Sequence, residues 1–248
     1  MELCDLSLHD YIHRADTPRP SESIPYFIKD APPEIKASQI WNIMRDIAEG
    51  LLYIHEHSLV HRDVKPLNGK ISVATLADIV VLYSRKDSVW KLVDFGLTSV
   101  GTSREVHSTI GRGTSGYRAP ELVSGSKGVY NNKVDIWSMG CILYELAVGR
   151  RAFCDDWTVI QHMNAGKDLE PDVDETFGEQ FGGEITENIL LMLRIDPESR
   201  PSATDLFNTI CRLCRPTNTS PLVDRRFQVL QAQTHPIRSD LHLNLVNH

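Results

Sequence analysis

The 248-residue chain lacks the features that mark several specialised classes of protein. None of its apolar runs approaches the roughly 20 residues that a transmembrane helix needs. The first residues, MELCDLSLHDYI, carry acids where a secretory signal carries basic residues. Cysteine is sparse and odd in number, at five, so we expect reduced thiols and no disulfide framework. These absences favour a cytoplasmic protein, with the nucleus as the alternative.

An excess of positive charge is missing too. Lysine and arginine number 26 against 33 acidic residues, which gives a formal net charge of −7. This balance argues against nucleic acid or an anionic membrane as the main partner. Hydrophobic residues make up 41% and charged residues 24%, the ordinary range of a globular protein with a sizeable core. Nothing in the sequence specifies an oligomeric state.

Two groupings of cysteine and histidine look like metal ligands but fit structural positions better. Cys211 and Cys214 form a lone C-x-x-C inside the helical pattern SATDLFNTICRLCR, with no second pair. His55 and His57 end a predicted helix, and His61 opens the loop after it. We therefore predict no metal site at either grouping.

Hydrophobic periodicity predicts a mostly helical domain. Residues 38–58 place apolar side chains on one face, which predicts an amphipathic helix with Ser38 as its N-cap. Residues 133–148 are apolar on nearly every side, as expected for a helix buried at the centre of a domain. Further helices are predicted at 157–165, 184–194 and 202–214.

The remaining segments predict one hairpin, an exposed loop and a tail. The β-rich runs IVVLYS (79–84) and SVWKLVDF (88–95) are joined by polar residues, which predicts a hairpin. Residues 16–36 are rich in proline, serine and charge, which predicts an exposed loop. After Pro216 the chain turns polar and irregular, with one short helix predicted around VDRRFQVLQ.

Four short motifs occur in a fixed order, and a late arginine follows them. They are HRDVKPLN (61–68), DFG (94–96), APE (119–121) and DIWSMGCILYEL (135–146), followed by Arg200 in RIDPESRPSA. Each motif is weak by itself, but the order and spacing together are specific. On these residues the chain resembles the eukaryotic-type protein kinases. Lys65, within HRDVKPLN, indicates the serine/threonine type.

This resemblance implies a fold class and a division of the chain. The fold would be α+β and mostly helical: the large C-terminal lobe of a protein-kinase-like fold, with one β-hairpin at the catalytic cleft. Residues 1–214 would form the hinge and this lobe, with an insert at 69–80. Residues 215–248 would form a polar tail.

The resemblance also assigns catalytic residues. Asp63 would accept the proton of the substrate hydroxyl and orient its oxygen for in-line attack. Lys65 would place a cation near the transferred phosphoryl group, and Thr114, in GTSGYRAPE, would bond both of these residues. The implied reaction transfers the γ-phosphoryl group of ATP to a serine or threonine hydroxyl of a protein substrate.

ATP and Mg²⁺ are the cofactors that the resemblance implies. Asn68 and Asp94 would supply oxygen ligands of the hard kind that Mg²⁺ prefers. Lys65 would also contact the nucleotide. The backbone groups of Glu2 and Cys4, in the segment that resembles the hinge, would contact the adenine.

Other residues of the motifs have structural or regulatory roles in the family. Glu121 and Arg200 would form a buried ion pair, and Asp135 would bond the backbone of the catalytic loop. Arg62, directly before the catalytic aspartate, is typical of kinases that are controlled by phosphorylation in the activation segment, here residues 97–118. A phosphate in that segment would pair with Arg62 and order it. The alternative is a segment that needs no phosphate.

The family's smaller first lobe is not found in the sequence. It carries a glycine-rich loop, a lysine that pairs the phosphates and a helix glutamate, whereas MELCDLSLHDYI resembles the hinge and the helix after it. GRGTSG (111–116) has the letters of a glycine loop, but it neither follows a predicted strand nor opens a helix. We therefore expect residues 1–248 by themselves to show no useful kinase turnover.

The stretch GKISVATLADIV (69–80) separates Asn68 from the strand that follows it directly in the family. Removing these residues restores the family's spacing to DFG. The insert can be a translated intron, since Gly69-Lys70 can be encoded by GGTAAG, or a tolerated loop. Either way, it puts the geometry of Asn68 in question.

Two rival functions come from other classes. One is a catalytically silent kinase-like binding module, which has no chemical need for the intact HRD, Lys65 and DFG letters. The other is a small-molecule kinase of similar fold, which the peptide-docking type of segment GTSGYRAPE disfavours. Labelling of a peptide from ATP, compared with labelling of a sugar or an aminoglycoside, separates the three.

Overall fold

The computed structural model describes residues 6–13, 28, 31, 33–66, 81–93, 99–100, 106–107, 113–124, 129–166, 169, 171–173 and 177–214. The chain divides into the units Met1–Cys214 and Arg215–His248, and every described residue lies in the first. The helices are α1 (Leu8–His13), α2 (Pro33–Glu56), α3 (Pro120–Val123), α4 (Lys133–Val148), α5 (Asp156–Ala165), α6 (Gly178–Met192), η4 (Pro197–Ser199) and α7 (Ala203–Leu213). The strands are β1 (Leu6–Ser7), β2 (Leu59–Val60), β3 (Val81–Ser84), β4 (Val89–Leu92), β5 (Ser99–Val100), β6 (Val106–His107) and β7 (Val129–Tyr130).

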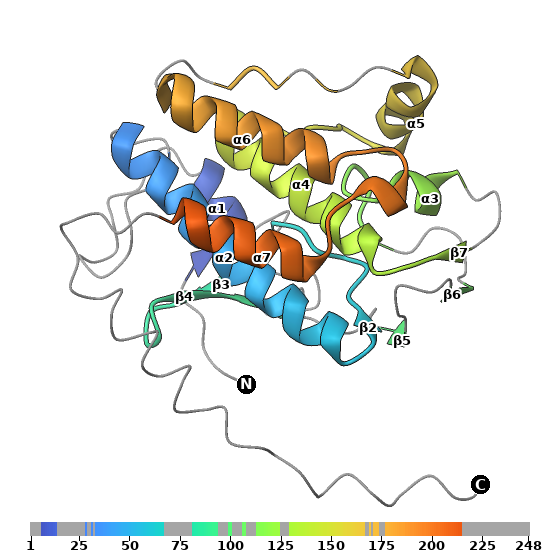
Figure 1. Cartoon of the computed structure of the whole chain (residues 1–248), viewed down its shortest axis with the longest axis horizontal. Coiled ribbons are helices and arrows are strands. Elements are labelled where there is room, and N and C mark those ends of the chain that lie inside the picture. Colours follow the sequence, from blue (N-terminus) through green and yellow to red (C-terminus); the bar gives the residue numbers. More distant parts are fainter. Residues whose placement is uncertain are drawn as a thin grey trace, which may run out of the picture. The chain divides into compact units, whose positions relative to one another are not determined.

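Two long helices, α2 and α4, carry the core. Helix α4 has the predicted bounds, and all of its residues from Val134 to Ala147 are buried, which confirms the prediction of a central helix. Helix α7 packs along α2 and α6 packs along α4 (Figure 1). No described helix has the length and apolar content to span a membrane. The predicted face of α2 is buried, namely Ile40, Ile43, Met44, Ile47, Leu51 and Ile54.

The predicted starts of two helices are wrong. Helix α2 begins at Pro33, so Ser38 lies inside the helix and is not its N-cap. Proline is tolerated in a first helical turn, because the N–H that it lacks has no partner there. Helix α6 begins at Gly178, six residues before the predicted position 184. Its first turns contain three glycines, which weakened the sequence signal.

The other helical predictions hold to within about a residue at most ends. Helix α5 begins at Asp156, one residue before the predicted start. Helix α7 begins after Ser202, whose side chain forms a capping box with Asp205. This arrangement satisfies backbone N–H groups that have no partner inside the helix.

The predicted hairpin is present as the antiparallel pair β3–β4, in which Val81 faces Leu92 and Ser84 faces Val89. Strand β1 adds to β3 as a third, antiparallel strand that periodicity did not predict. The pairs β2–β5 and β6–β7 were also unpredicted, since two residues are too short to show a period. The insert 69–80, the tail from 215 on, residues 94–95 of the hairpin and most of the predicted loop 16–36 lie outside the described residues.

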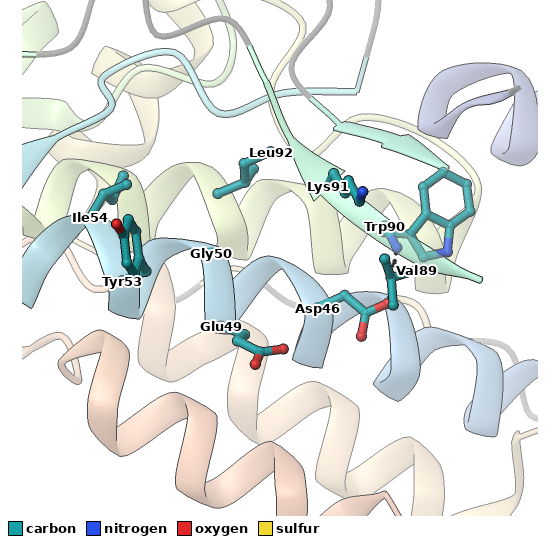
Figure 2. A pocket seen from close by; sticks show the side chains of 9 residues that line it. All are labelled: Asp46, Glu49, Gly50, Tyr53, Ile54, Val89, Trp90, Lys91 and Leu92. Atoms are coloured by element: carbon teal, nitrogen blue, oxygen red, sulfur yellow. Dashed lines mark hydrogen bonds between the residues drawn. The ribbon is translucent and has the colours of Figure 1, made fainter. Parts of the chain in front are cut away.

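A buried acid on α2 accepts a hydrogen bond from the hairpin, and the hairpin approaches α2 closely at a glycine. The Asp46 carboxylate accepts the backbone N–H of Trp90 at 3.0 Å, and it also pairs with Arg45 at 2.9 Å. A Cβ at Gly50 would lie 2.9 Å from Cδ1 of Leu92, so a larger residue there would require the Leu92 side chain to shift. Figure 2 shows Asp46 beside Trp90, and Gly50 on α2 below Leu92.

A groove of about 370 Å³ lies between α2 and β4. Its walls are mixed, with acids at one end and apolar side chains toward Tyr53, which is 64% exposed. The two predicted catalytic residues that the structure describes, Asp63 and Lys65, do not line it. The groove is lined by Asp46, Glu49, Gly50, Tyr53, Ile54, Val89, Trp90, Lys91 and Leu92.

Candidate active site

The loop at 61–66 is shaped by one buried aspartate on α4. Asp135 is fully buried, and its two oxygens accept the backbone N–H groups of His61 at 2.8 Å and Arg62 at 2.7 Å. His55 adds a third bond at 2.9 Å. Burial by itself would raise the pKa of Asp135, but the hydrogen bond and charge of His55, with His61 and the Arg62 N–H, lower it below its ordinary value. The predicted role of this aspartate is confirmed.

The loop presents Asp63 and Lys65 side by side. The Lys65 ammonium donates to one Asp63 oxygen at 2.9 Å and to the Thr114 hydroxyl at 2.6 Å. That hydroxyl donates to the other Asp63 oxygen at 2.6 Å. Only 12% of the Asp63 side chain and 8% of the Lys65 side chain are exposed. The structure therefore forms the predicted cluster, a carboxylate held by a cation and a hydroxyl at the edge of the fold's interior.

Thr114 reaches the loop because the residue before it is a glycine. Gly113 has φ +94°, and a Cβ there would lie 2.7 Å from the backbone oxygen of Arg62. The described part of GRGTSG, residues 113–116, forms a turn closed by the bond from the Tyr117 N–H to the Thr114 oxygen at 3.1 Å, and it opens no helix. This geometry agrees with the expectation that the stretch belongs to the activation segment.

The predicted ion pair between Glu121 and Arg200 is present and bidentate, with distances of 2.7 and 2.9 Å. Arg200 is 2% exposed, and it also donates to the backbone oxygen of Lys133 at 3.0 Å. Its guanidinium lies 5.1 Å from the ring centre of Trp137. The pair ties the APE motif to the helical core around α4.

A second buried acid on α4 was missed. Glu145 accepts the Tyr117 hydroxyl at 2.5 Å and pairs with Nε2 of His13 at 2.6 Å. Burial and the neighbouring Glu145 carboxylate raise the pKa of Tyr117. The sequence did hold a signal, because an acid in a helix that is apolar all round must find buried partners. Nothing in the sequence indicated which residues those partners are.

Four predicted site residues, Glu2, Cys4, Asn68 and Asp94, lie outside the described residues. The structure fixes one neighbour of this group, since Nε2 of His61 donates to the backbone oxygen of Val93, directly before Asp94, at 3.2 Å. The catalytic loop is therefore tied to the strand that leads into DFG.

The two groupings set aside as metal ligands form no metal site in the described structure. Among the described residues, no group of three or more His, Cys, Asp or Glu side chains could hold a metal ion. His55 bonds Asp135 instead, and His57 bonds the Tyr53 backbone. Cys211 and Cys214 are free thiols, and burial raises the pKa of Cys214 to about 11.

Comparison with known proteins identifies the family. Residues 9–210, well over half of the chain, match the protein kinase domain family. Mitogen-activated protein kinase kinase 2 of Arabidopsis thaliana is 32% identical over 179 residues, which is 69% of this chain and 45% of that protein. Mitogen-activated protein kinase kinase kinase 1 of the same plant is 30% identical over 177 residues, 71% of this chain and 26% of that protein. The probable serine/threonine-protein kinase nek3 of Dictyostelium discoideum is 31% identical over 168 residues, 68% of this chain and 14% of that protein.

The chain belongs to the protein kinase family. Its α+β, mostly helical fold is that of a protein kinase, as the motifs predicted. The chain spans less than half of the length of each of these relatives.

Proposed function

We propose that this protein is a serine/threonine kinase in which Asp63 is the catalytic base. The observation that carries the proposal is the Asp63–Lys65–Thr114 cluster, where one carboxylate, one ammonium and one hydroxyl meet within 2.9 Å. The carboxylate orients the substrate hydroxyl and accepts its proton as the oxygen attacks phosphorus. Lys65 offsets negative charge on the transferred group. Phosphoryl transfer asks little more of the protein than such positioning and neutralisation.

The type of acceptor rests on Lys65 and Thr114. A lysine two residues after the base, bonded to a threonine of the segment before APE, is the serine/threonine pattern of the family. One of these relatives is named a probable serine/threonine-protein kinase, and the other two are named mitogen-activated protein kinase kinase 2 and mitogen-activated protein kinase kinase kinase 1. The protein substrate is therefore proposed to offer a serine or threonine hydroxyl.

ATP and Mg²⁺ are proposed as cofactors, and the residues fit them chemically. Asn68 and Asp94 offer the amide and carboxylate oxygens that Mg²⁺ prefers, and the bond between His61 and Val93 ties the catalytic loop to the residue before Asp94. When bound, Mg²⁺ neutralises charge on the phosphates. The backbone of Glu2 and Cys4 is proposed to contact the adenine, and Lys65 the transferred phosphate.

The domain boundary and the location are part of the same proposal. A kinase domain at 1–214 followed by a polar tail at 215–248 is supported by the division of the chain after Cys214. A cytoplasmic location, with the nucleus as the alternative, is proposed from the small and odd number of cysteines in the sequence, five.

A labelling experiment tests the function. Wild-type protein and Asp63→Asn are incubated with radiolabelled ATP, Mg²⁺ and either a mixed peptide pool, a sugar or an aminoglycoside. We expect label only on serine or threonine of the peptides, and only with the wild type. Label is expected to accumulate only slowly, because residues 1–248 by themselves are expected to show no useful kinase turnover. Label on the small molecules, or equal label from Asp63→Asn, would overturn the proposal.

A further inference from the structure

Tyr130 stands between the activation segment and the catalytic loop. It lies on β7, whose backbone pairs with β6 at Val106–His107, within the segment 97–118. Its side chain is buried, at 3% exposure. The next residue, Asn131, bonds the Glu198 side chain at 2.9 Å and the Lys133 N–H at 3.0 Å. The bonds of Asn131 therefore anchor the chain directly after Tyr130, between β7 and α4. The backbone of β7 pairs with part of the activation segment.

On its other side Tyr130 contacts Arg62. One guanidinium nitrogen of Arg62 donates to the Tyr130 hydroxyl at 3.2 Å, and the guanidinium carbon lies 5.8 Å from the ring centre. Arg62 also has φ +72°, a left-handed conformation that side-chain-bearing residues rarely adopt. Such a conformation persists only where the surroundings hold it. The Arg62 backbone is held by Asp135, and its side chain is held in part by Tyr130.

We propose that Tyr130 is a positioning residue that holds Arg62 in this conformation. Because Asp63 follows Arg62 directly, Tyr130 also positions Asp63. This effect requires that β7 stays paired with β6. The geometry of the base thereby depends on the activation segment through β6, Tyr130 and Arg62. This inference rests on the proposed function of Asp63. It adds a residue outside the four motifs, and a contact that needs no phosphate.

A purely structural role for Tyr130 predicts a different result. If its hydroxyl only satisfied a buried polar group, its loss would lower global stability and speed hydrogen exchange of all core amides alike. A positioning role predicts a local effect instead. The amides of His61 and Arg62, both bonded to Asp135, should exchange faster while those in the middle of α4 do not.

The test compares Tyr130→Phe, which removes only the hydroxyl, with Tyr144→Phe. Tyr144 is a buried tyrosine on α4 that packs against Arg150. Amide exchange is measured on the full chain by mass spectrometry or NMR. In Tyr130→Phe we expect the His61 and Arg62 amides to exchange about tenfold faster, because one hydrogen bond from a charged donor is lost. In Tyr144→Phe they should keep the wild-type rate. Equal exchange in both variants overturns the proposal.

Two further variants test the path from the segment. Val106→Pro removes an N–H and disrupts the two-residue ladder, so it should speed exchange of the Arg62 amide as Tyr130→Phe does. In the double variant the Arg62 amide should exchange no more than about twofold faster than in either single variant, because both changes act through one contact. Fully multiplicative effects would show that the ladder and the hydroxyl act separately, and would overturn the coupling.

A kinetic measurement links the contact to catalysis. In single-turnover transfer to a peptide, Tyr130→Phe should lower the rate about tenfold and leave the ATP concentration that gives half of the maximal rate unchanged. An unchanged rate together with faster exchange of the Arg62 amide overturns the positioning role. If the wild type transfers no phosphate, the proposed function fails, while the exchange experiment still decides whether Tyr130 holds Arg62.

Discussion

Two aspartates shape the loop at 61–66, namely Asp63 within it and Asp135 on α4. Their hydrogen-bond partners differ in kind. Asp135 is fully buried, and each of its oxygens accepts a backbone N–H of the loop. Asp63 keeps 12% of its side chain exposed, and its described partners are the side chains of Lys65 and Thr114. Backbone donors cannot turn away, whereas an ammonium and a hydroxyl can rotate. The first aspartate therefore suits a fixed framework, and the second suits a base that must exchange partners with a substrate.

Replacing the framework aspartate should give the largest effect. In Asp135→Asn the amide NH₂ must face a backbone N–H, which leaves a buried donor without an acceptor, and His55 loses the negative charge with which it pairs. We expect the free energy of unfolding to fall by about 3–5 kcal/mol, measured by urea denaturation. Asp205→Asn, in the first turn of α7, is the matched control and should cost no more than about 1 kcal/mol. Similar losses in the two variants would refute the contrast.

Replacing the base should affect the rate and spare the fold. Asp63→Asn keeps the shape of the side chain but cannot accept the proton, so phosphoryl transfer should fall about a hundredfold or more. The free energy of unfolding should change by less than about 1 kcal/mol. Asp87→Asn, in the turn between β3 and β4, serves as the control, and its rate should match that of the wild type. An unchanged rate in Asp63→Asn would remove the residue from catalysis.

The bridging hydroxyl should contribute less than the base itself. Thr114→Val has the same shape and no hydrogen bond, so Asp63 and Lys65 lose their common partner. We expect the transfer rate to fall about tenfold, the value of a hydrogen bond to a charged group. Thr114→Ser keeps the hydroxyl and should recover most of the rate. A serine variant as slow as the valine variant would mean that the methyl group matters, and not the bond.

The same contrast explains what the sequence could predict. Residues 133–148 were predicted with the correct bounds because the run is apolar on nearly every side and ends at Gly149, which has a φ of +77° and is the C-cap. The bonds among Asp63, Lys65 and Thr114 were predicted from the family pattern. The first of these predictions depends on local sequence alone. The second depends on family motifs that name both partners of each contact.

Contacts between distant residues with no pattern could not be predicted. His13 and Glu145 are 132 positions apart, and neither belongs to a spacing rule that names the other. The contact between Arg62 and Tyr130 spans 68 positions in the same way. The early start of α2 was hidden because its first turn reads as a proline-rich loop. In each case tertiary packing selects the partner, and sequence periodicity does not record it.

A third carboxylate, exposed on the surface, should give the smallest effect. Asp205 accepts the hydroxyl and the backbone N–H of Ser202 at the start of α7, and these two bonds lower its pKa. Because the pKa is lower in the folded protein, the stabilisation is present above the unfolded value of about 3.9. It is lost as the pH falls through the folded value. The stability gap between the wild type and Asp205→Asn should therefore be constant from pH 7 to about pH 5 and close below about pH 4. Urea unfolding at each pH measures this gap. The contributions of carboxylates that both proteins share cancel in the difference. A gap of the same size at pH 3 would show that the charge of Asp205 contributes nothing to the cap.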